Sequence, residues 1–474
     1  MQKSRFKVVI TFALLAACSS GPAVPGSGEL PDAGGSAGSG AGGAAGNAGT
    51  APDVDGAAGA GGASGGAAGA GGASGGGAGA GGSTGGAAGA AGSTGGAAGA
   101  GGSTGGAAGA GGTTGGAVIL NQTGNPIYAQ LTSYTSWLSV AADAAAKLTE
   151  DKALADNMIT WQMPHGGFYK NAKTVYAAPW DGTAARSGWL GENNVELGTI
   201  DNDATVIELM FLADVYRRSG DIKYRDSARK ALDFLLTMQH AMGGFPQVYP
   251  ARALTTYSNY VTFNDDAMAR VMVLLDQAAK LKPPLDSDLF TTEQRDRLPS
   301  SITKGIDYIV KAQMEQNGVK TVWCAQHDPV TYAPKPARSY ELASKSGKES
   351  ANVVALLMTQ PQTPEIKAAA LAAIAWFKSG AVKVADTAYV KRPAGNTDDT
   401  YNPIQASPGT TIWYRFYDLD KDVGFFSGRL PTDNPPGVGK KYNIMEIEAE
   451  RRYGYEWGGG YGTKLFMYTD SVGY

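Results

Sequence analysis

Cysteine and histidine are scarce in this chain, with only two cysteines and three histidines among 474 residues. Cys18 ends an apolar N-terminal run, and Cys324 is the other cysteine. If Cys18 carries a lipid, no intramolecular disulfide can form and Cys324 is a lone thiol. Because so few histidines are available to activate a nucleophile, we expect Cys324 to be a buried packing residue.

An excess of charge of one sign is also absent. Lysine and arginine number 40, aspartate and glutamate number 43, and the formal net charge is −3. A nucleic-acid-binding domain is expected to be strongly basic. The composition therefore argues against a nucleic-acid partner.

No apolar run is long enough to span a bilayer as a mature helix. The apolar stretch from Val8 to Ala17 follows a basic start and ends in the letters LAAC, which is typical of a bacterial lipoprotein signal peptide over residues 1–18. A plain secretory signal with an incidental cysteine is the alternative. Since Ser19 does not indicate retention at an inner membrane, the sequence predicts a lipid anchor at Cys18 on the outer membrane or cell surface, or a secreted form.

Residues 19–116 lack the apolar side chains that a core needs. They consist almost entirely of Gly, Ala, Ser and Thr in near-repeats such as AGAGGSTGGA, which predicts a flexible linker. Residues 117–474 contain no second low-complexity break, so we expect them to form one catalytic domain, and the protein to be a monomer.

A glutamine followed by glycine and an aromatic residue recurs along this domain. The three glutamines, 77 and then 74 positions apart, are Gln162, Gln239 and Gln313. Polar clusters precede apolar runs of period 3.6 at IDND, NDD and KES, and a second helical pattern follows at 224–239, 302–313 and 365–377. With partner helices at 131–161 and near 442–453, this predicts an all-α toroid of helix pairs whose loops line a groove. Strand signals are sparse, the best being 410–417.

The acidic clusters have two interpretations. Asp, Asn and Ser before a helix cap its free N–H groups. Capping needs a single residue, whereas IDND and NDD place several carboxylates and amides together, which a hard cation such as Ca²⁺ prefers.

The stretch Trp323–Ser350 is too polar and too rich in proline to be one regular element. Long loops inside compact domains are usually functional or disordered, and its aromatic and charged residues argue against disorder. We interpret it as the wall of an active site for an acidic, ring-shaped substrate.

Eight motifs in order resemble the catalytic domain of family 10 pectate lyases: TIDNDAT, GGFPQVYP, FNDDAM, WCAQHD, PARSYELAS, SGKES, WYRFYDLD and FFSGR. The resemblance covers roughly residues 160–461. It implies an (α/α)₃ toroid that cleaves the (1→4)-α-D-galacturonan polygalacturonate, or pectin, by β-elimination with Ca²⁺, giving unsaturated oligogalacturonates.

The resemblance also implies that Arg338, in PARSYE, is the catalytic base. Arginine resists this role because its pKa exceeds about 12, although burial beside other cations would lower it. From the residues alone, Lys345 is the second candidate, because lysine shifts its pKa more readily, and an ion pair with Glu341 is the structural alternative for Arg338.

The remaining candidates share a fit to a uronate polymer or its cation. Substrate contacts are predicted at Arg415, Arg429, Lys345, Tyr340, Asn202 and Lys170, and calcium ligands at Asp203, Asp265 and Asp266. Core packing is an equally open interpretation of Tyr340 and Trp323. The other function classes are a toroid glycoside hydrolase acting on a uronic-acid polysaccharide and a surface-anchored glycan-binding lipoprotein.

Overall fold

The computed structural model describes residues 120–252, 256–429 and 439–474. The predicted signal peptide, its Cys18 and the linker at 19–116 lie outside the described residues. None of the helices in those three ranges combines the length and the apolar composition that a membrane crossing needs.

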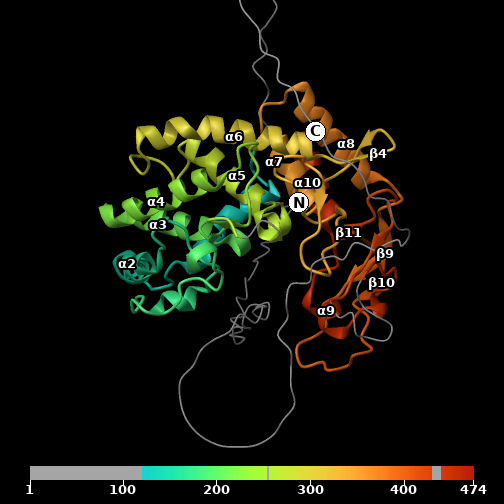
Figure 1. Ribbon diagram of the computed structural model, residues 1–474, viewed down its shortest axis with the longest axis horizontal. Coiled ribbons are helices and arrows are strands. Elements are labelled where there is room, and N and C mark those ends of the chain that lie inside the picture. The colour runs from blue at the N-terminus through green and yellow to red at the C-terminus, as the bar shows by residue number, and fades with distance from the viewer. Residues whose placement is uncertain (1–119, 253–255, 430–438) are drawn as a thin grey trace, which may run out of the picture. The chain divides into compact units, whose positions relative to one another are not determined.

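Six helices of the described chain form three consecutive pairs, as the repeat predicted (Figure 1). The first helix of each pair is α3 (Val206–Ser219), α5 (Ala267–Ala279) and α7 (Glu349–Met358). The second is α4 (Ile222–Met238), α6 (Thr292–Ala312) and α8 (Pro364–Lys378).

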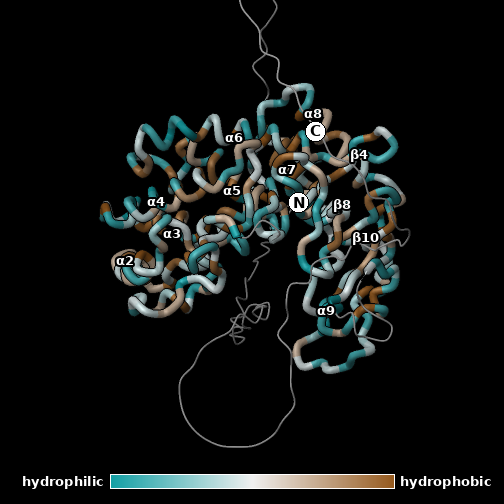
Figure 2. The backbone as a smooth tube through the Cα atoms, viewed as in Figure 1, coloured by the Kyte–Doolittle hydropathy of each residue, from teal (hydrophilic) through white to brown (hydrophobic). Residues whose placement is uncertain are grey.

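The two sets of helices form an inner and an outer ring. Helix α5 contacts both α3 and α7, while α6 contacts both α4 and α8. Nearly every residue of α5 is buried, as expected of a helix enclosed on all sides, and apolar segments gather around α5 and α7 (Figure 2). The predicted (α/α)₃ toroid is therefore confirmed.

Apart from 3₁₀ turns of three to five residues, five further helices of the described chain lie outside the three pairs. They are α1 (Pro126–Gln130), the 3₁₀ helix η1 (Leu131–Trp137), α2 (Ala144–Trp161), α9 (Ala449–Gly454) and α10 (Tyr461–Val472). Helix α1 packs against α5, α7 and α10. The predicted helix at 131–161 is thus two elements, and the one predicted near 442–453 is the short α9.

The recurring glutamine fastens each helix pair to the next. Gln162 Nε2 donates to the carbonyls of Gly166 at 2.8 Å and Ser227 on α4 at 3.0 Å. Gly166 has φ +94°, and a Cβ there would lie 2.2 Å from a backbone oxygen of α4, so only glycine fits. Gln239 repeats both bonds one helix pair later, to Gly243 and to Ser301 on α6.

The described chain also contains short β-sheets of two or three strands. The largest has the order β13–β10–β9, with β9 (Val384–Tyr389), β10 (Ile404–Tyr414) and β13 (Gly458–Gly459). The strand predicted at 410–417 is confirmed, since it spans the end of β10 and all of β11 (Phe416–Tyr417). Strand β11 pairs with β12 (Gly424–Phe425) and with β8 (Lys345–Ser346).

The other strands are two residues each and pin loops together. They are β1 (Gly198–Thr199) with β2 (Val248–Tyr249), β3 (Val261–Thr262) with β6 (Gln326–His327) and β7 (Pro334–Lys335), and β4 (Glu315–Gln316) with β5 (Val319–Lys320). Apart from β6, β7, β8 and the first two residues of α7, the stretch Trp323–Ser350 is irregular, as expected, and within it Cys324 is buried and forms no disulfide among the described residues.

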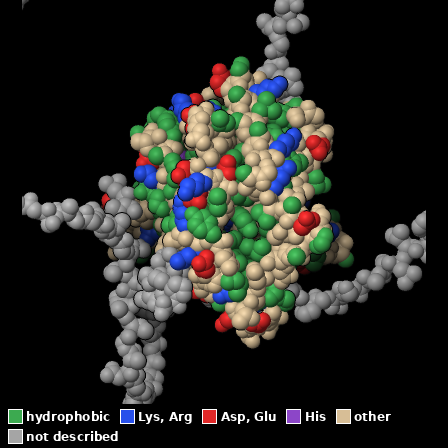
Figure 3. Space-filling view, turned by 90° about the vertical axis from the view of Figure 1, so that its right-hand side faces the viewer, with side chains coloured by type: hydrophobic (Ala, Val, Ile, Leu, Met, Phe, Trp, Pro, Cys, Tyr) green, Lys and Arg blue, Asp and Glu red, His purple; other side chains and the backbone are tan. Residues whose placement is uncertain are grey.

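Two apolar cores hold the domain. The larger follows the helix rings, and the smaller is an aromatic cluster that includes Tyr340, Phe416, Tyr455 and Trp457. On the face turned toward the viewer in Figure 3, acidic and basic side chains are interspersed, in keeping with the small net charge.

Candidate active site

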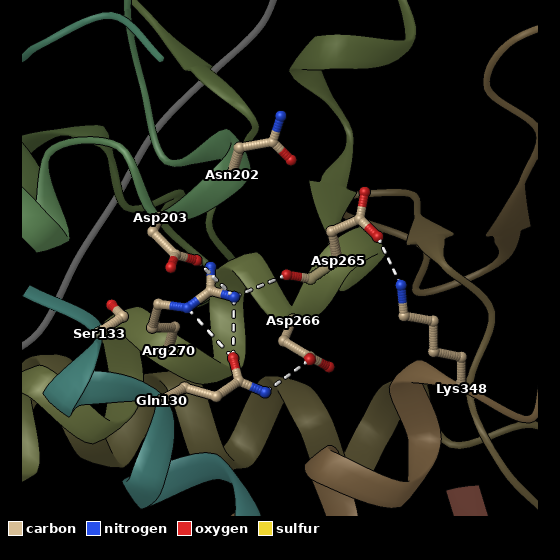
Figure 4. Close-up of a pocket in the computed structure, with 8 residues that line it drawn as sticks. All are labelled: Gln130, Ser133, Asn202, Asp203, Asp265, Asp266, Arg270 and Lys348. Atoms are coloured by element: carbon tan, nitrogen blue, oxygen red, sulfur yellow. Dashed lines mark hydrogen bonds and ion pairs between the residues drawn. The ribbon is translucent and has the colours of Figure 1, made fainter. Parts of the chain in front are cut away.

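A cavity of about 340 Å³ opens where the inner helices begin (Figure 4). Every residue that lines it is polar or charged: Gln130, Ser133, Asn202, Asp203, Asp265, Asp266, Arg270 and Lys348. The two predicted acidic clusters therefore come together, although they are more than sixty positions apart in the sequence.

Each acidic cluster is a strained 3₁₀ turn just before an inner helix, η4 (Asp201–Asp203) before α3 and η6 (Asn264–Asp266) before α5. Asp203 and Asp265 adopt φ +67° and +50°, a left-handed conformation that non-glycine residues rarely hold and that concentrates at functional sites. At neither helix does the N-cap residue make a side-chain capping bond within the described structure. Asp203 and Asp265 instead line the cavity, so the capping interpretation does not describe them.

Asp265 is held by two cations and an amide. Its Oδ1 lies 2.9 Å from Lys348 Nζ and 3.0 Å from Arg415 Nη2, and its Oδ2 accepts from Asn264 Nδ2 at 2.9 Å. Burial raises the pKa of Asp265, but Arg415 and Lys348 outweigh it and hold the pKa well below its usual range. Asp265 is therefore a carboxylate under all ordinary conditions.

Asp203 and Asp266 are joined through Arg270. Arg270 Nη2 lies 2.7 Å from Asp203 Oδ1 and also donates to Gln130 Oε1 at 2.8 Å, while Gln130 Nε2 donates to Asp266 Oδ2 at 2.8 Å. Asp266 Oδ1 is buried and has no hydrogen-bond partner in the described part of the chain. Burial raises the pKa of Asp266, with Arg270 opposing.

The side-chain oxygens in the cavity are of the kind that a hard cation prefers as ligands. They belong to Asp203, Asp265, Asp266 and Asn202, and among the described residues Asp266 Oδ1 has no hydrogen-bond partner. The described residues do not, however, arrange three or more His, Cys, Asp or Glu side chains as a metal cage. An ion at this position would need oxygen ligands beyond these side chains.

A second charged group is centred on Arg338. Its guanidinium makes two bonds to Glu341, Nε to Oε2 at 2.8 Å and Nη2 to Oε1 at 2.7 Å. Tyr455 Oη donates to the same Glu341 Oε1 at 2.8 Å, and Arg415 lies over the Tyr455 ring at 4.2 Å. Through Tyr455 and Arg415, Arg338 is thus connected to Asp265 in the cavity.

Three guanidiniums surround the ring of Tyr340. Arg338, Arg429 and Arg451 lie 4.8, 5.2 and 4.7 Å from its centroid. Glu450 pairs with both Arg429 and Arg451. Three arginines therefore gather around one aromatic ring on this side of the site, each paired with Glu341 or Glu450.

A family model described as pectic acid lyase matches residues 162–466. The chain belongs to this family. It is also similar to the solved structure of a family 10 polysaccharide lyase from Cellvibrio cellulosa, at 41% identity over 75% of this chain and 99% of the other, with a TM-score of 0.64. A mutant of that lyase in complex with trigalacturonic acid matches equally well, over 75% of this chain and all of the other. No curated protein matches this chain.

In this pectic acid lyase family member, three of the predicted substrate contacts are buried away from the cavity lining. Tyr340 is 2% exposed beneath its three arginines, and Arg415 is 2% exposed between Asp265 and Glu349, with Glu349 Oε1 at 2.7 Å. The side chain of Lys345 is 0% exposed and pairs with Asp422 at 2.5 Å. As placed, these three can support the site but do not reach into the cavity.

The other predicted residues lie at or near the surface of the site. Asn202, Asp203, Asp265 and Asp266 line the cavity. Lys170 pairs with Asp201, the neighbour of Asn202, at 2.9 Å and lies over the Trp189 ring at 4.7 Å. The Arg429 side chain is 37% exposed.

The site also contains residues for which no specific role was predicted from the sequence, among them Gln130, Ser133, Arg270, Lys348 and Glu349; the last two lie in the stretch interpreted as an active-site wall. Lys348 and Glu349 belong to the SGKES motif, and spacing alone does not distinguish Lys348 from Lys345. Arg270 and Gln130 carry no local signal, because their contacts span up to 140 positions.

Proposed function

We propose that this protein is a pectate lyase that cleaves polygalacturonate by β-elimination. The observation that carries the proposal is the cavity that joins Asp203 and Asp265 to Lys348 and Arg270, connected through Arg415 and Tyr455 to Arg338, in a chain of the pectic acid lyase family. The similar Cellvibrio lyase is described in complex with trigalacturonic acid, an oligomer of the same uronate.

The reaction breaks the C5–H and C4–O bonds and forms a C4–C5 double bond, a bond from the proton to the base, and an O–H bond on the departing glycosidic oxygen, whose proton comes from solvent. A base removes the C5 proton of a galacturonate residue, the electrons of the C5–H bond form a C4–C5 double bond, and the C4–O bond breaks so that the glycosidic oxygen leaves. The C5 proton is only weakly acidic. Because C5 is bonded to the uronate carboxylate, negative charge spreads onto that carboxylate in the transition state, and cationic groups there lower the barrier.

Arg338 is the proposed base. Its burial and the repulsion between its guanidinium and that of Arg451 favour the neutral form. Glu341 opposes them strongly, and the net effect holds the pKa of Arg338 above its usual range. Glu341 therefore both orients this base and limits how readily it loses its own proton.

Calcium is the proposed cofactor, with Asp265 as the leading ligand because it is held ionised, and Asp203 and Asp266 beside it. When bound, the ion would neutralise a uronate carboxylate and so acidify the C5 proton. Substrate oxygens and water would supply the ligands that the described residues lack.

Recognition of the polymer is assigned to exposed cations and amides around the cavity. Lys348 and Asn202 line it, Lys170 pairs with Asp201 in the same turn as Asn202, and Arg429 lies beside Tyr340 and Arg338. Arg415 is buried and does not line the cavity. Its role is to hold Asp265 and Glu349 in place through ion pairs with its guanidinium.

The test is to supply wild-type protein with polygalacturonate, with calcium and with a chelator. A lyase gives unsaturated products that absorb in the ultraviolet, and the chelator abolishes them. A hydrolase gives reducing ends without that absorbance, and a glycan-binding protein gives neither; either outcome would contradict the proposal.

For the whole chain we propose a monomeric lipoprotein anchored at Cys18 to the outer membrane and facing outward, with residues 19–116 as the linker. The support is the LAAC sequence and the composition of those residues.

A further inference from the structure

Gln130 enters the active site from outside the residues that the family model matches, which begin at residue 162. It is the last residue of α1, which packs against α5 and α7. Figure 4 shows its carboxamide between Arg270 and Asp266 on the wall of the cavity.

The carboxamide uses both of its ends on charged partners. Its oxygen accepts from Arg270 Nη2 at 2.8 Å and from Arg270 Nε at 3.2 Å, and its nitrogen donates to Asp266 Oδ2 at 2.8 Å. A carboxamide can accept from a guanidinium and donate to a carboxylate at the same time, because it carries both an acceptor oxygen and a donor nitrogen. A carboxylate at this position would repel Asp266, and an apolar side chain would make neither contact.

These contacts reach both strained turns. Arg270 Nη2, which Gln130 holds, also contacts Asp203 Oδ1 at 2.7 Å and the backbone oxygen of Asp265 at 3.0 Å. Turns with left-handed aspartates persist only when their surroundings fix them. Gln130 is the residue of α1 that links this guanidinium to the second turn's Asp266.

We infer that Gln130 is a positioning residue for the lyase: through Arg270 and Asp266 it sets the relative placement of Asp203 and Asp265. The inference rests on the proposed function, because its importance lies in what those two carboxylates do. It also makes the segment between the linker and the first helix pair part of the active site.

The chain supplies a matched control. Gln122 lies in the same N-terminal segment and is also half-buried, and its carboxamide likewise bridges two side chains of α5: its nitrogen donates to Asp276 at 3.1 Å, and its oxygen accepts from Gln277 at 3.0 Å. Those contacts lie at the C-terminal end of α5, whereas Arg270 lies near its start, and Gln122 does not line the cavity. Replacing either glutamine with methionine keeps the length of the side chain and removes its hydrogen bonds.

The experiment compares full-length wild type, Gln130→Met and Gln122→Met by melting temperature, by kcat/KM on polygalacturonate and by calorimetric binding of trigalacturonate in calcium. We expect similar changes in melting temperature for the two variants. Gln130→Met should lower kcat/KM about 10- to 100-fold and weaken trigalacturonate binding, because bonds to charged groups are lost, while Gln122→Met stays within about twofold of wild type.

Equal activity and affinity in the two variants would overturn the inference and leave the proposed function intact. If wild type makes no unsaturated product, the proposed function fails, and the inference is then judged by whether Gln130→Met alone loses trigalacturonate affinity. Should Gln130→Met not fold, Gln130→Asn, which keeps the amide but cannot span both partners, makes the same comparison.

Discussion

Arg338 and Glu341 form a two-point ion pair, 2.8 Å from Nε to Oε2 and 2.7 Å from Nη2 to Oε1, and Glu341 is almost fully buried. This is the structural alternative that the sequence left open, and it coexists with the proposed catalytic role. The pair orients the guanidinium and at the same time stabilises its protonated form.

Replacing Arg338 with alanine should lower kcat by about 10²- to 10⁴-fold, the usual contribution of a general base. Arg338→Lys should not restore it, because lysine cannot make the two-point contact with Glu341. Steady-state rates and trigalacturonate affinity check this, and binding should persist. Arg392→Ala, which removes an arginine paired with the exposed Asp399, is the control; near-normal kcat in Arg338→Ala would mean that another group is the base.

Neutralising Glu341 should shift the pH dependence of the reaction. Because Glu341 raises the pKa of Arg338, Glu341→Gln lowers it, and the rise of kcat/KM with pH should move to lower pH. The pH–rate profiles of wild type and variant are compared. An unchanged profile would show that the ionisation controlling kcat/KM is not that of Arg338.

Arg415 and Arg429 should behave oppositely, since one is buried and the other is 37% exposed. Arg415→Ala leaves Asp265 and Glu349 without their shared cation and should destabilise the fold by about 3–5 kcal/mol in denaturant unfolding. Arg429→Ala should leave stability nearly unchanged and weaken trigalacturonate binding about 10- to 150-fold. Normal binding by Arg429→Ala would remove it from the substrate site.

Glu208 gives the fold a pH dependence unrelated to the reaction. It is fully buried, bonds Tyr176 Oη at 2.9 Å, and burial raises its pKa from 4.5 to about 8. The folded state therefore keeps a proton that the unfolded state releases, so the free energy of unfolding should fall by a few kcal/mol as pH rises from about 4.5 to about 8. Urea unfolding of Glu208→Gln should lack this loss, whereas Glu293→Gln, exposed in the first turn of α6, should retain it. A wild type equally stable at both pH values would contradict the assignment.

The proposed anchor and linker are tested together. Cys18→Ala, or inhibition of the lipoprotein signal peptidase, should release the protein from membranes or block its maturation, while deleting residues 20–116 should leave kcat/KM and melting temperature unchanged. A mature wild type found entirely in the soluble fraction would exclude the anchor.

The helical fold could be predicted because local sequence patterns indicate where each helix begins and ends. The glutamine and glycine repeat marks the join between helix pairs, and Gln162 and Gln239 make the same two bonds in the structure. The acidic clusters were identifiable for the same reason: each directly precedes an inner helix, so the toroid gathers them at one end.

The rest depends on long-range packing that no local pattern encodes. Lys345 and Lys348 are only three positions apart in the sequence. Lys345 lies in β8 and pairs with Asp422, whereas Lys348 is the N-cap of α7 and pairs with Asp265. Arg415 is predicted as a substrate contact because arginine binds uronates, yet its position between β10 and β11 buries it against two carboxylates.

The most direct measurement of the central claim is the mass of the products released from defined oligogalacturonates by wild type and by Arg338→Ala. Elimination adds no water, so the account predicts that wild type in calcium releases a new non-reducing-end fragment lighter by one water than the corresponding galacturonide, and that Arg338→Ala releases almost none. Fragments that all carry the mass of ordinary galacturonides would identify a hydrolase and contradict the account.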